Sequence, residues 1–167
     1  MNAMRVGCIR ALRAEFGARF VGGLAPTPFA RKHFPDCVAD PSVCQKHRYL
    51  RLMKRALVCV ATRGLQGSNG WRLAEYLAAS RAIVSETLRF DVPNLIPGVN
   101  YLSMTSVEEC LSQVRALVED GERRREMMHA NEAFYRANLR PDSIVRRCLN
   151  VALSGNESRP LDRGLPQ

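Results

Sequence analysis

The sequence predicts an α/β fold, in which helices flank a parallel sheet and a helical segment ends the chain. Two continuous apolar runs, residues 56–62 (ALVCVAT) and 81–87 (RAIVSET), have the length and branched composition of strands that are buried on both faces. A helical pattern over 71–80 separates them, and residues 100–104 form a third candidate strand. Strands that alternate with helices in this way predict parallel pairing with right-handed crossovers.

The N-terminal third predicts a helix, a strand and a second helix. Apolar residues recur at helical spacing over 3–17, and RFVGGLA, residues 19–25, predicts a strand that leads into a proline-containing loop. Ser42 and Gln45 have the spacing of a capping box for a basic helix that runs to about Arg55. Because such a domain usually opens on a strand, we expect its first strand to lie upstream of this chain.

Three further helices are predicted after the third strand. Ser106 and Glu109 form a second capping box, in front of a helix whose apolar residues recur at spacings of three and four. A helix of mixed charge is predicted over 122–138, and a last helix over 141–153, where a proline stands at the first position.

The composition is that of one domain of ordinary size. The chain has 167 residues, of which 46% are hydrophobic and 25% charged, enough to build a single core. We expect this domain to cover residues 1–153 and the polar remainder, 154–167, to be a disordered tail. No apolar run is long enough to span a bilayer, and the basic N-terminus lacks the apolar core of a secretory signal. These features predict a cytoplasmic protein without a transmembrane segment.

The cysteines and the net charge favour some kinds of site over others. The six cysteines form no CxxC pair, and Cys59, Cys110 and Cys148 occupy apolar positions of predicted elements. We therefore expect buried, reduced thiols rather than a zinc site or disulfides. The net charge of +9 suits nucleic acid, an acidic membrane surface or an anionic small molecule. Since the arginines are spread along the chain and no nucleic-acid-binding motif is present, no nucleic-acid partner is predicted.

The segment between the first two buried strands predicts an anion site. After a strand that ends near Thr62, three glycines allow a tight turn and close backbone approach to a ligand: Gly64, Gly67 and Gly70. Ser68 or Asn69 can cap the helix that follows, and free amides at its N-terminus attract an anion with help from the helix dipole. In open α/β sheets, ligands bind at this edge, beyond the carboxyl ends of the strands.

Glu75 lies about one turn inside that helix. Helical side chains lean toward the N-terminus, so its carboxylate can reach a ligand at the helix end. A carboxylate repels phosphate but is well matched to two ribose hydroxyls. We therefore expect a diphosphate on the loop amides, a ribose on Glu75, and added positive charge from Arg63 or Arg72. Trp71 either stacks on the ligand or packs against the sheet, and spacing alone also fits an ordinary loop with a solvated glutamate.

Three stretches carry a resemblance to a known family: GSNGWRLAEYLAASRAIVSE, NYLSMTSVEECLSQVRALVEDGERRREMM and FYRANLRPDSIV. They resemble the C-terminal domain of group 1 glycosyltransferases of the GT-B fold, and are most similar to the spore-maturation-protein-like subgroup. The resemblance covers residues 3–150 and implies a Rossmann-like domain in which Glu75 binds the donor ribose and the loop 67–70 faces the diphosphate. The donor-binding residues expected on these grounds are Arg63, Gly67, Ser68, Asn69, Gly70, Trp71, Arg72 and Glu75.

The chain also departs from that family. Many retaining members carry a second glutamate eight residues before the ribose-binding one, and this position is Gly67 here. The first strand and the N-terminal acceptor domain of such enzymes are absent, and no residue is predicted as a catalytic base. We expect a donor-binding domain that transfers sugar from a nucleotide-diphosphate sugar to an unknown acceptor, without an obligatory metal and with a missing or separate acceptor domain. The alternative is a non-catalytic nucleotide-binding remnant.

Overall fold

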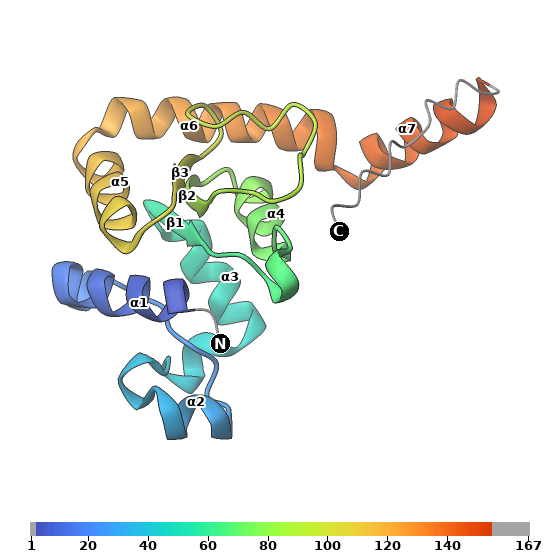
Figure 1. The fold of residues 1–167 in the computed structure, drawn as a ribbon. Helices are drawn as coiled ribbons and strands as arrows, with labels where there is room; N and C mark the ends of the chain where they lie inside the picture. The colour runs from blue at the N-terminus through green and yellow to red at the C-terminus, as the bar shows by residue number, and fades with distance from the viewer. Residues whose placement is uncertain (1–2, 155–167) are drawn as a thin grey trace, which may run out of the picture.

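A three-stranded parallel sheet lies at the centre of the computed structural model, which describes residues 3–154 (Figure 1). The strands follow the sheet order β1-β2-β3: β1 (Val58–Ala61), β2 (Ala82–Glu86) and β3 (Leu102–Met104). Val84, in the central strand, pairs with Val60 on one side and with Leu102 on the other. Both strand pairs are parallel, which confirms the predicted α/β fold with a Rossmann-like sheet.

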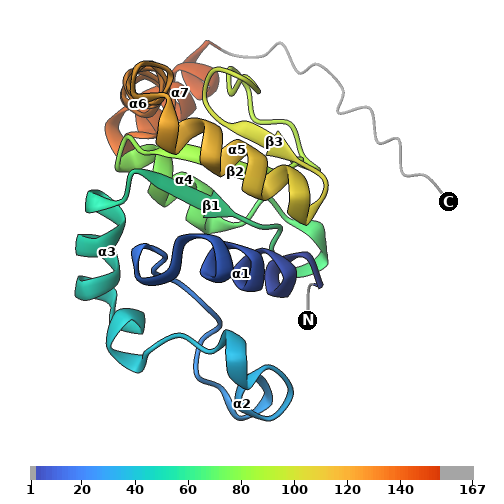
Figure 2. The same ribbon diagram turned by 90° about the vertical axis from the view of Figure 1, so that its left-hand side faces the viewer.

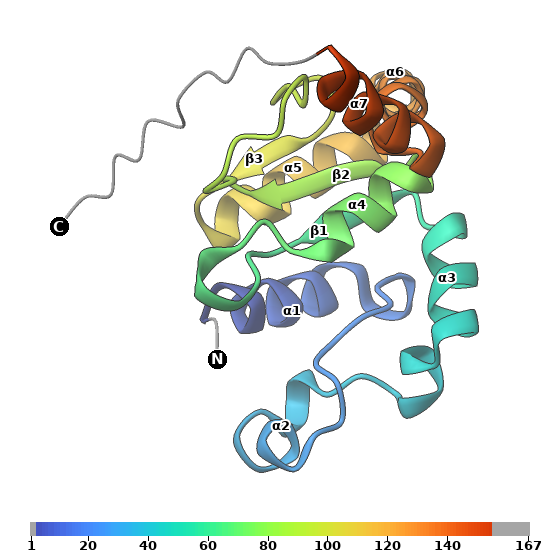
Figure 3. The same cartoon turned by 90° about the vertical axis from the view of Figure 1, so that its right-hand side faces the viewer.

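The described part of the chain contains seven α-helices: α1 (Ala3–Phe16), α2 (Pro28–His33), α3 (Lys46–Arg55), α4 (Trp71–Ala78), α5 (Val107–Glu119), α6 (Gly121–Phe134) and α7 (Pro141–Leu153). α5 covers one face of the sheet and packs on α1, while α4 covers the other face (Figures 2 and 3). α3 lies beside the sheet and leads directly into β1, whereas α7 extends away from the rest of the molecule (Figure 1). No helix within residues 3–154 combines the length and the apolar composition needed to cross a membrane.

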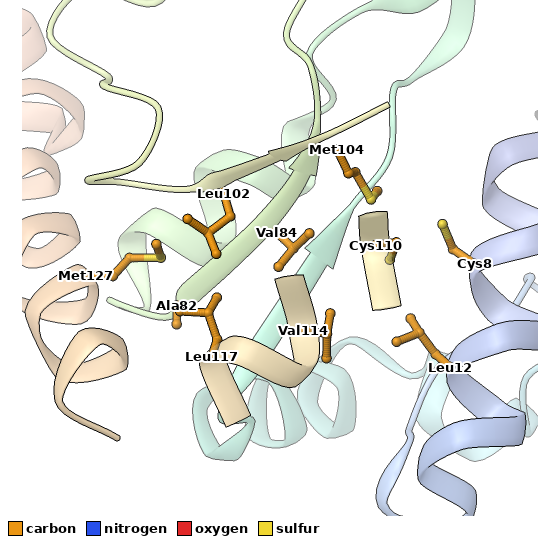
Figure 4. Close-up of a cluster of buried hydrophobic side chains, with 10 residues drawn as sticks. All are labelled: Cys8, Leu12, Ala82, Val84, Leu102, Met104, Cys110, Val114, Leu117 and Met127. Atoms are coloured by element: carbon orange, nitrogen blue, oxygen red, sulfur yellow. The ribbon is translucent and has the colours of Figure 1, made fainter. Parts of the chain in front are cut away.

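Two hydrophobic clusters, one on each face, hold the sheet between its helices. Figure 4 shows the first cluster, whose ten buried side chains come from α1, β2, β3, α5 and α6. In β2, Ala82 and Val84 belong to this cluster, whereas Ile83 belongs to the second one under α4. Each large apolar side chain buried in this way contributes about 1.5–3 kcal/mol. The second cluster also includes Met53 of α3 and Leu73 of α4, so it fixes these two helices beside each other.

Residues 19–25 do not form the predicted strand. α1 ends in a short 3-10 turn, Gly17–Arg19, and in the following segment only Leu24 makes a β-bridge, with Val38. Leu24 packs with α1 in a third, small cluster. At Gly23, where φ is +149°, an added Cβ would lie 2.7 Å from the carbonyl oxygen of Cys37. The backbone of this segment therefore packs closely on the backbone of residues 37–39. The strand prediction rested on apolar content and could not detect this contact.

The two predicted capping boxes had different outcomes. Ser106 accepts a hydrogen bond from the Glu109 amide at 3.1 Å, which confirms the predicted cap. The Glu109 carboxylate accepts its return bond from the Thr105 amide, at 2.6 Å, one residue before the N-cap. The box at Ser42 is wrong. Asp40 accepts the Ser42 amide hydrogen bond and starts a separate 3-10 turn, so α3 begins only at Lys46.

The C-terminal helices match the prediction in order but not in detail. α6 is capped by Asp120 and passes into a π-helical turn, Tyr135–Leu139, where the sequence predicted one continuous helix. α7 begins at Pro141 as predicted, but none of its residues is buried, so the predicted burial of Cys148 is wrong. Cys59 and Cys110 are buried as predicted, and all six thiols are free. Of the tail predicted over 154–167, residues 155–167 lie outside the described residues.

Candidate functional site

Glu75 lies in α4 with its carboxylate turned toward α3. Lys46 Nζ lies 2.6 Å from one carboxylate oxygen, and the Tyr49 hydroxyl donates a hydrogen bond of 2.8 Å to the other. The Glu75 side chain is 17% exposed, whereas that of Lys46 is 62% exposed. A carboxylate has about four lone-pair sites, so these two bonds leave acceptor capacity for a ligand. The acid is therefore partly exposed and partly neutralised.

Lys46 contacts Glu75 and Trp71 on the same face of α4. Lys46 Nζ lies 5.0 Å from the centre of the Trp71 ring, and Trp71 stands one turn N-terminal to Glu75. The carboxylate thus shares a helix face with the first residue of α4, as expected for a side chain that leans toward the helix N-terminus. Trp71 is 67% exposed, so it does not pack against the sheet.

Tyr49 links the acid to a second cation. The Arg72 guanidinium carbon lies 4.9 Å from the centre of the Tyr49 ring. Burial raises the pKa of the Tyr49 phenol, with smaller contributions from Tyr76 and from the bond to Glu75, so the hydroxyl remains a donor at neutral pH. We refer to the resulting group as the α3–α4 cluster, which consists of Lys46, Tyr49, Trp71, Arg72 and Glu75.

The loop between β1 and α4 depends on its glycines. Gly67 and Gly70 have φ values of +77° and +71°, in the left-handed region that favours glycine. The Gly64 amide donates to the Ser68 carbonyl at 2.7 Å, and an added side chain at Gly64 would collide with the Ser68 hydroxyl. This tight turn leads the chain from the end of β1 into the first turn of α4.

The predicted cap at Ser68 or Asn69 is wrong. The N-cap of α4 is Gly70, and no side chain within residues 3–154 accepts a hydrogen bond from the amides of the first turn. Those amides are therefore left for solvent or a ligand to satisfy. The Asn69 side chain turns away from α4, because its amide nitrogen donates to the Phe90 carbonyl at 2.6 Å and its oxygen accepts from the amides of Arg89 and Phe90.

Arg63 binds the neighbouring strand instead of the α3–α4 cluster. Its Nε donates to the Thr87 carbonyl at 2.9 Å, and its amide donates to Glu86 Oε2 at 2.6 Å. On the other side, Arg5 of α1 donates to the Thr62 hydroxyl and to the Arg63 carbonyl. The carboxyl ends of β1 and β2 are thus joined by charged side chains.

The structure divides the predicted donor-binding residues into three groups. Trp71, Arg72 and Glu75 lie in the α3–α4 cluster, Gly67 to Gly70 form the loop in front of α4, and Arg63 lies beside β2. Sequence reasoning missed Lys46 and Tyr49, which hold Glu75. Their spacing of three on a helix with an apolar inner face was the available signal.

In the described part of the chain, no hydrogen bond or ring contact joins a histidine side chain to this cluster. His33, His47 and His129 are all exposed, and His33 stacks on Phe29 at a ring distance of 4.5 Å. Within residues 3–154, no three side chains among His, Cys, Asp and Glu form a group that could hold a metal ion.

Comparison with known proteins identifies the family. Neither the curated proteins nor the solved structures gave a match. A family profile described as glycosyl transferase-like matches residues 7–150, a span that includes the sheet, the glycine loop and the whole α3–α4 cluster. The chain therefore belongs to the glycosyl transferase-like family.

Proposed function

We propose that this chain is the donor-binding domain of a glycosyltransferase, related to the C-terminal domain of group 1 enzymes of the GT-B fold. The observation that carries the proposal is the glycine loop that enters α4 without a side-chain cap, one turn before the acid of the α3–α4 cluster. In this arrangement the first-turn amides bind the diphosphate of a nucleotide sugar, and Glu75 accepts hydrogen bonds from the ribose hydroxyls.

Lys46 has two roles in the proposal. In the structure it neutralises Glu75 at 2.6 Å. When a ribose hydroxyl replaces Lys46 as the hydrogen-bond donor to Glu75, the Lys46 ammonium can turn toward the diphosphate, because it carries three donors on a flexible side chain. Arg72 adds a second positive charge from the same helix turn. Together the amides and cations stabilise the charge that develops on the leaving nucleoside diphosphate, without an obligatory metal.

Calorimetry with nucleoside diphosphates tests donor binding. Replacing Glu75 by Gln is expected to weaken a nucleoside diphosphate about tenfold or more, because a charged acceptor of hydrogen bonds is lost. Inorganic pyrophosphate has no ribose, so its affinity should not fall. Glu132→Gln, on the exposed face of α6, is the matched control. Equal affinity of the wild type and Glu75→Gln for the nucleoside diphosphate would refute the assignment of Glu75.

Transfer itself is a separate question. We propose that an acceptor-binding domain, on the same or another polypeptide, completes the enzyme and covers the exposed apolar side chains of α7, among them Val145, Leu149 and Leu153. A turnover assay with several sugar donors separates this proposal from the non-catalytic alternative. Nucleotide binding with neither transfer nor donor hydrolysis, even with candidate acceptor domains added, would favour the remnant.

A further inference from the structure

α3 is a strongly basic helix. Its ten residues include five lysines and arginines and no acidic residue. Met53 is buried, and Tyr49 and Leu50 are half-buried against the second hydrophobic cluster, so the inner face is fixed to the body of the protein. The outer face is therefore held rigidly toward solvent, beside the sheet (Figures 2 and 3).

Three cations of the outer face have no side-chain partner in the described part of the molecule. Arg51, Lys54 and Arg55 are exposed, and their side chains make no hydrogen bond or ion pair with any described residue. Of the α3 side chains, only Lys46 enters an ion pair within residues 3–154. Favourable interaction with the helix dipole accounts for Lys54 and Arg55 in the last turn, but not for Arg51 in the middle of the helix.

Exposed apolar side chains lie among these cations. Leu52 is 36% exposed and stands four residues after Arg48 and three before Arg55, so it shares their face. Leu57, just beyond the helix, is 54% exposed. Cations that alternate with aliphatic side chains suit the boundary between charged headgroups and acyl chains, whereas a phosphodiester backbone offers the leucines no apolar contact.

We propose that the outer face of α3 is a docking surface for an anionic lipid bilayer, made by Arg48, Arg51, Leu52, Lys54, Arg55 and Leu57. The cations contact acidic headgroups while Leu52 and Leu57 reach below them. Each Lys or Arg near such a surface strengthens binding about fivefold, so the contact is reversible and weakens with salt. The inference does not rest on donor binding, since α3 faces the α3–α4 cluster through its other side.

Vesicle co-sedimentation of the full chain tests the proposal. We expect binding to phosphatidylcholine vesicles that contain phosphatidylglycerol at about 0.1 M salt, and loss of binding at about 1 M salt. The variant Arg51→Gln/Lys54→Gln/Arg55→Gln should bind about 100-fold more weakly. The control Arg123→Gln/Arg125→Gln/Arg146→Gln removes the same charge from exposed positions of α6 and α7 and should stay within about threefold of the wild type.

Several results would overturn the proposal. Equal losses in the two triple variants would show a general effect of net charge, and equal binding to pure phosphatidylcholine would remove the role of headgroup charge. Leu57→Ser should weaken vesicle binding by at least about threefold. If it has no effect, and duplex RNA at the same salt binds α3 more tightly than vesicles do, the partner is a nucleic acid. Circular dichroism and nucleoside-diphosphate calorimetry on each variant separate misfolding, and failure of donor binding, from loss of the lipid contact.

Discussion

Asn131 is a fully buried polar residue that joins α6 to the sheet region. Its side-chain nitrogen donates to the carbonyls of Arg81 and Asn100, at 2.7 and 2.9 Å, and its oxygen accepts from the Asn100 side chain at 3.0 Å. Replacing Asn131 by Ala is expected to lower the free energy of unfolding by roughly 2–4 kcal/mol, because it leaves buried carbonyls without donors and opens a small cavity. Urea unfolding with an unchanged m-value measures the loss.

The neighbouring Glu132 supplies the control for this experiment. Its exposed ion pair with Arg136 spans one helical turn, and such pairs contribute less than about 0.5 kcal/mol. A destabilisation by Asn131→Ala no larger than that of Glu132→Ala would contradict the role of the buried amide.

The Arg10–Asp36 pair predicts a pH dependence of stability. The hydrogen bonds from Arg10 lower the pKa of the Asp36 carboxyl from 3.8 to about 2. Because the folded state lowers this pKa, the pair stabilises the protein above about pH 4, and this contribution disappears as the pH falls toward 2. Thermal melts should therefore show a difference between wild type and Asp36→Asn that is constant near neutral pH and vanishes by about pH 2.

Arg10→Gln tests whether the pair is the cause. It should show the same loss over the same pH range, and the double variant should lose no more than either single variant. A difference between wild type and Asp36→Asn that persists unchanged down to pH 2 would contradict the assignment. Because both side chains are about half exposed, high salt should also reduce the effect.

Glu75 shows which part of a site is local in the sequence. Its place one turn inside α4, behind a glycine-rich loop, follows from spacing and was predicted. Its partners Lys46 and Tyr49 lie more than 25 residues away, and only the packing of α3 on the second cluster brings them to it. The cap prediction at Asn69 failed for the same reason, because the 89–90 backbone competes for its side chain.

At the scale of elements, the contact between α1 and α5 depends on a glycine. A Cβ added at Gly7 would lie 2.6 Å from Val107 Cγ2, on a β-branched side chain that has little freedom to move. Gly7→Ala is therefore expected to lower the free energy of unfolding by about 1–3 kcal/mol, although alanine is the better helix former. Thermal or urea unfolding measures the effect.

The rescue variant makes this prediction specific. Val107→Ala removes the methyl group that Gly7→Ala would strike, so the double variant should be more stable than Gly7→Ala alone. If Gly7→Ala instead stabilises the protein, the close approach of α1 and α5 is not as the structure describes.

The elements differ in how far local sequence determines them. β1 and β2 were predicted because continuous apolar runs suit strands covered on both faces, and β2 is buried at every position. RFVGGLA, residues 19–25, has similar apolar content, but such a segment forms a strand only where a neighbouring strand can pair with it. In the described structure it packs on residues 37–39 instead. The π-helical turn after α6 has no recognised local signal.

At the scale of the whole molecule, α7 is expected to contribute little to stability. None of its residues is buried, and its tie to the body includes hydrogen bonds such as Ser143 to the Arg136 carbonyl and Arg147 to the Asn138 carbonyl. A chain that ends at Arg140 should melt within about 4 °C of the full chain, since only about 1 kcal/mol is lost. Circular dichroism measures the midpoint.

A second truncation provides the contrast. Ending the chain at Asp120 also removes Met127, Asn131 and Phe134 from the core, and this chain should fail to fold cooperatively. A drop of more than about 10 °C on removing α7 alone would show that the helix is packed against the body.

The layered fold and the position of the glycine loop in it were predictable for a common reason. Parallel strands that alternate with helices have their carboxyl ends at one edge of the sheet. The glycine loop follows β1 directly, so it must lie at this edge. The arrangement of side chains across that edge was not, because it depends on pairs distant in sequence, such as Arg5 with Thr62 and Arg63 with Thr87.

The edge position of β1 has a consequence for association between chains. In the described part of the molecule β1 pairs only with β2, so its other edge has no strand partner. The strand is only four residues long, its side chains are buried or half-buried, and just past it the guanidinium of Arg5 donates a hydrogen bond to the Arg63 carbonyl. Short edge strands are one way in which proteins limit pairing between sheets, so β1 is a poor template for a strand of another chain.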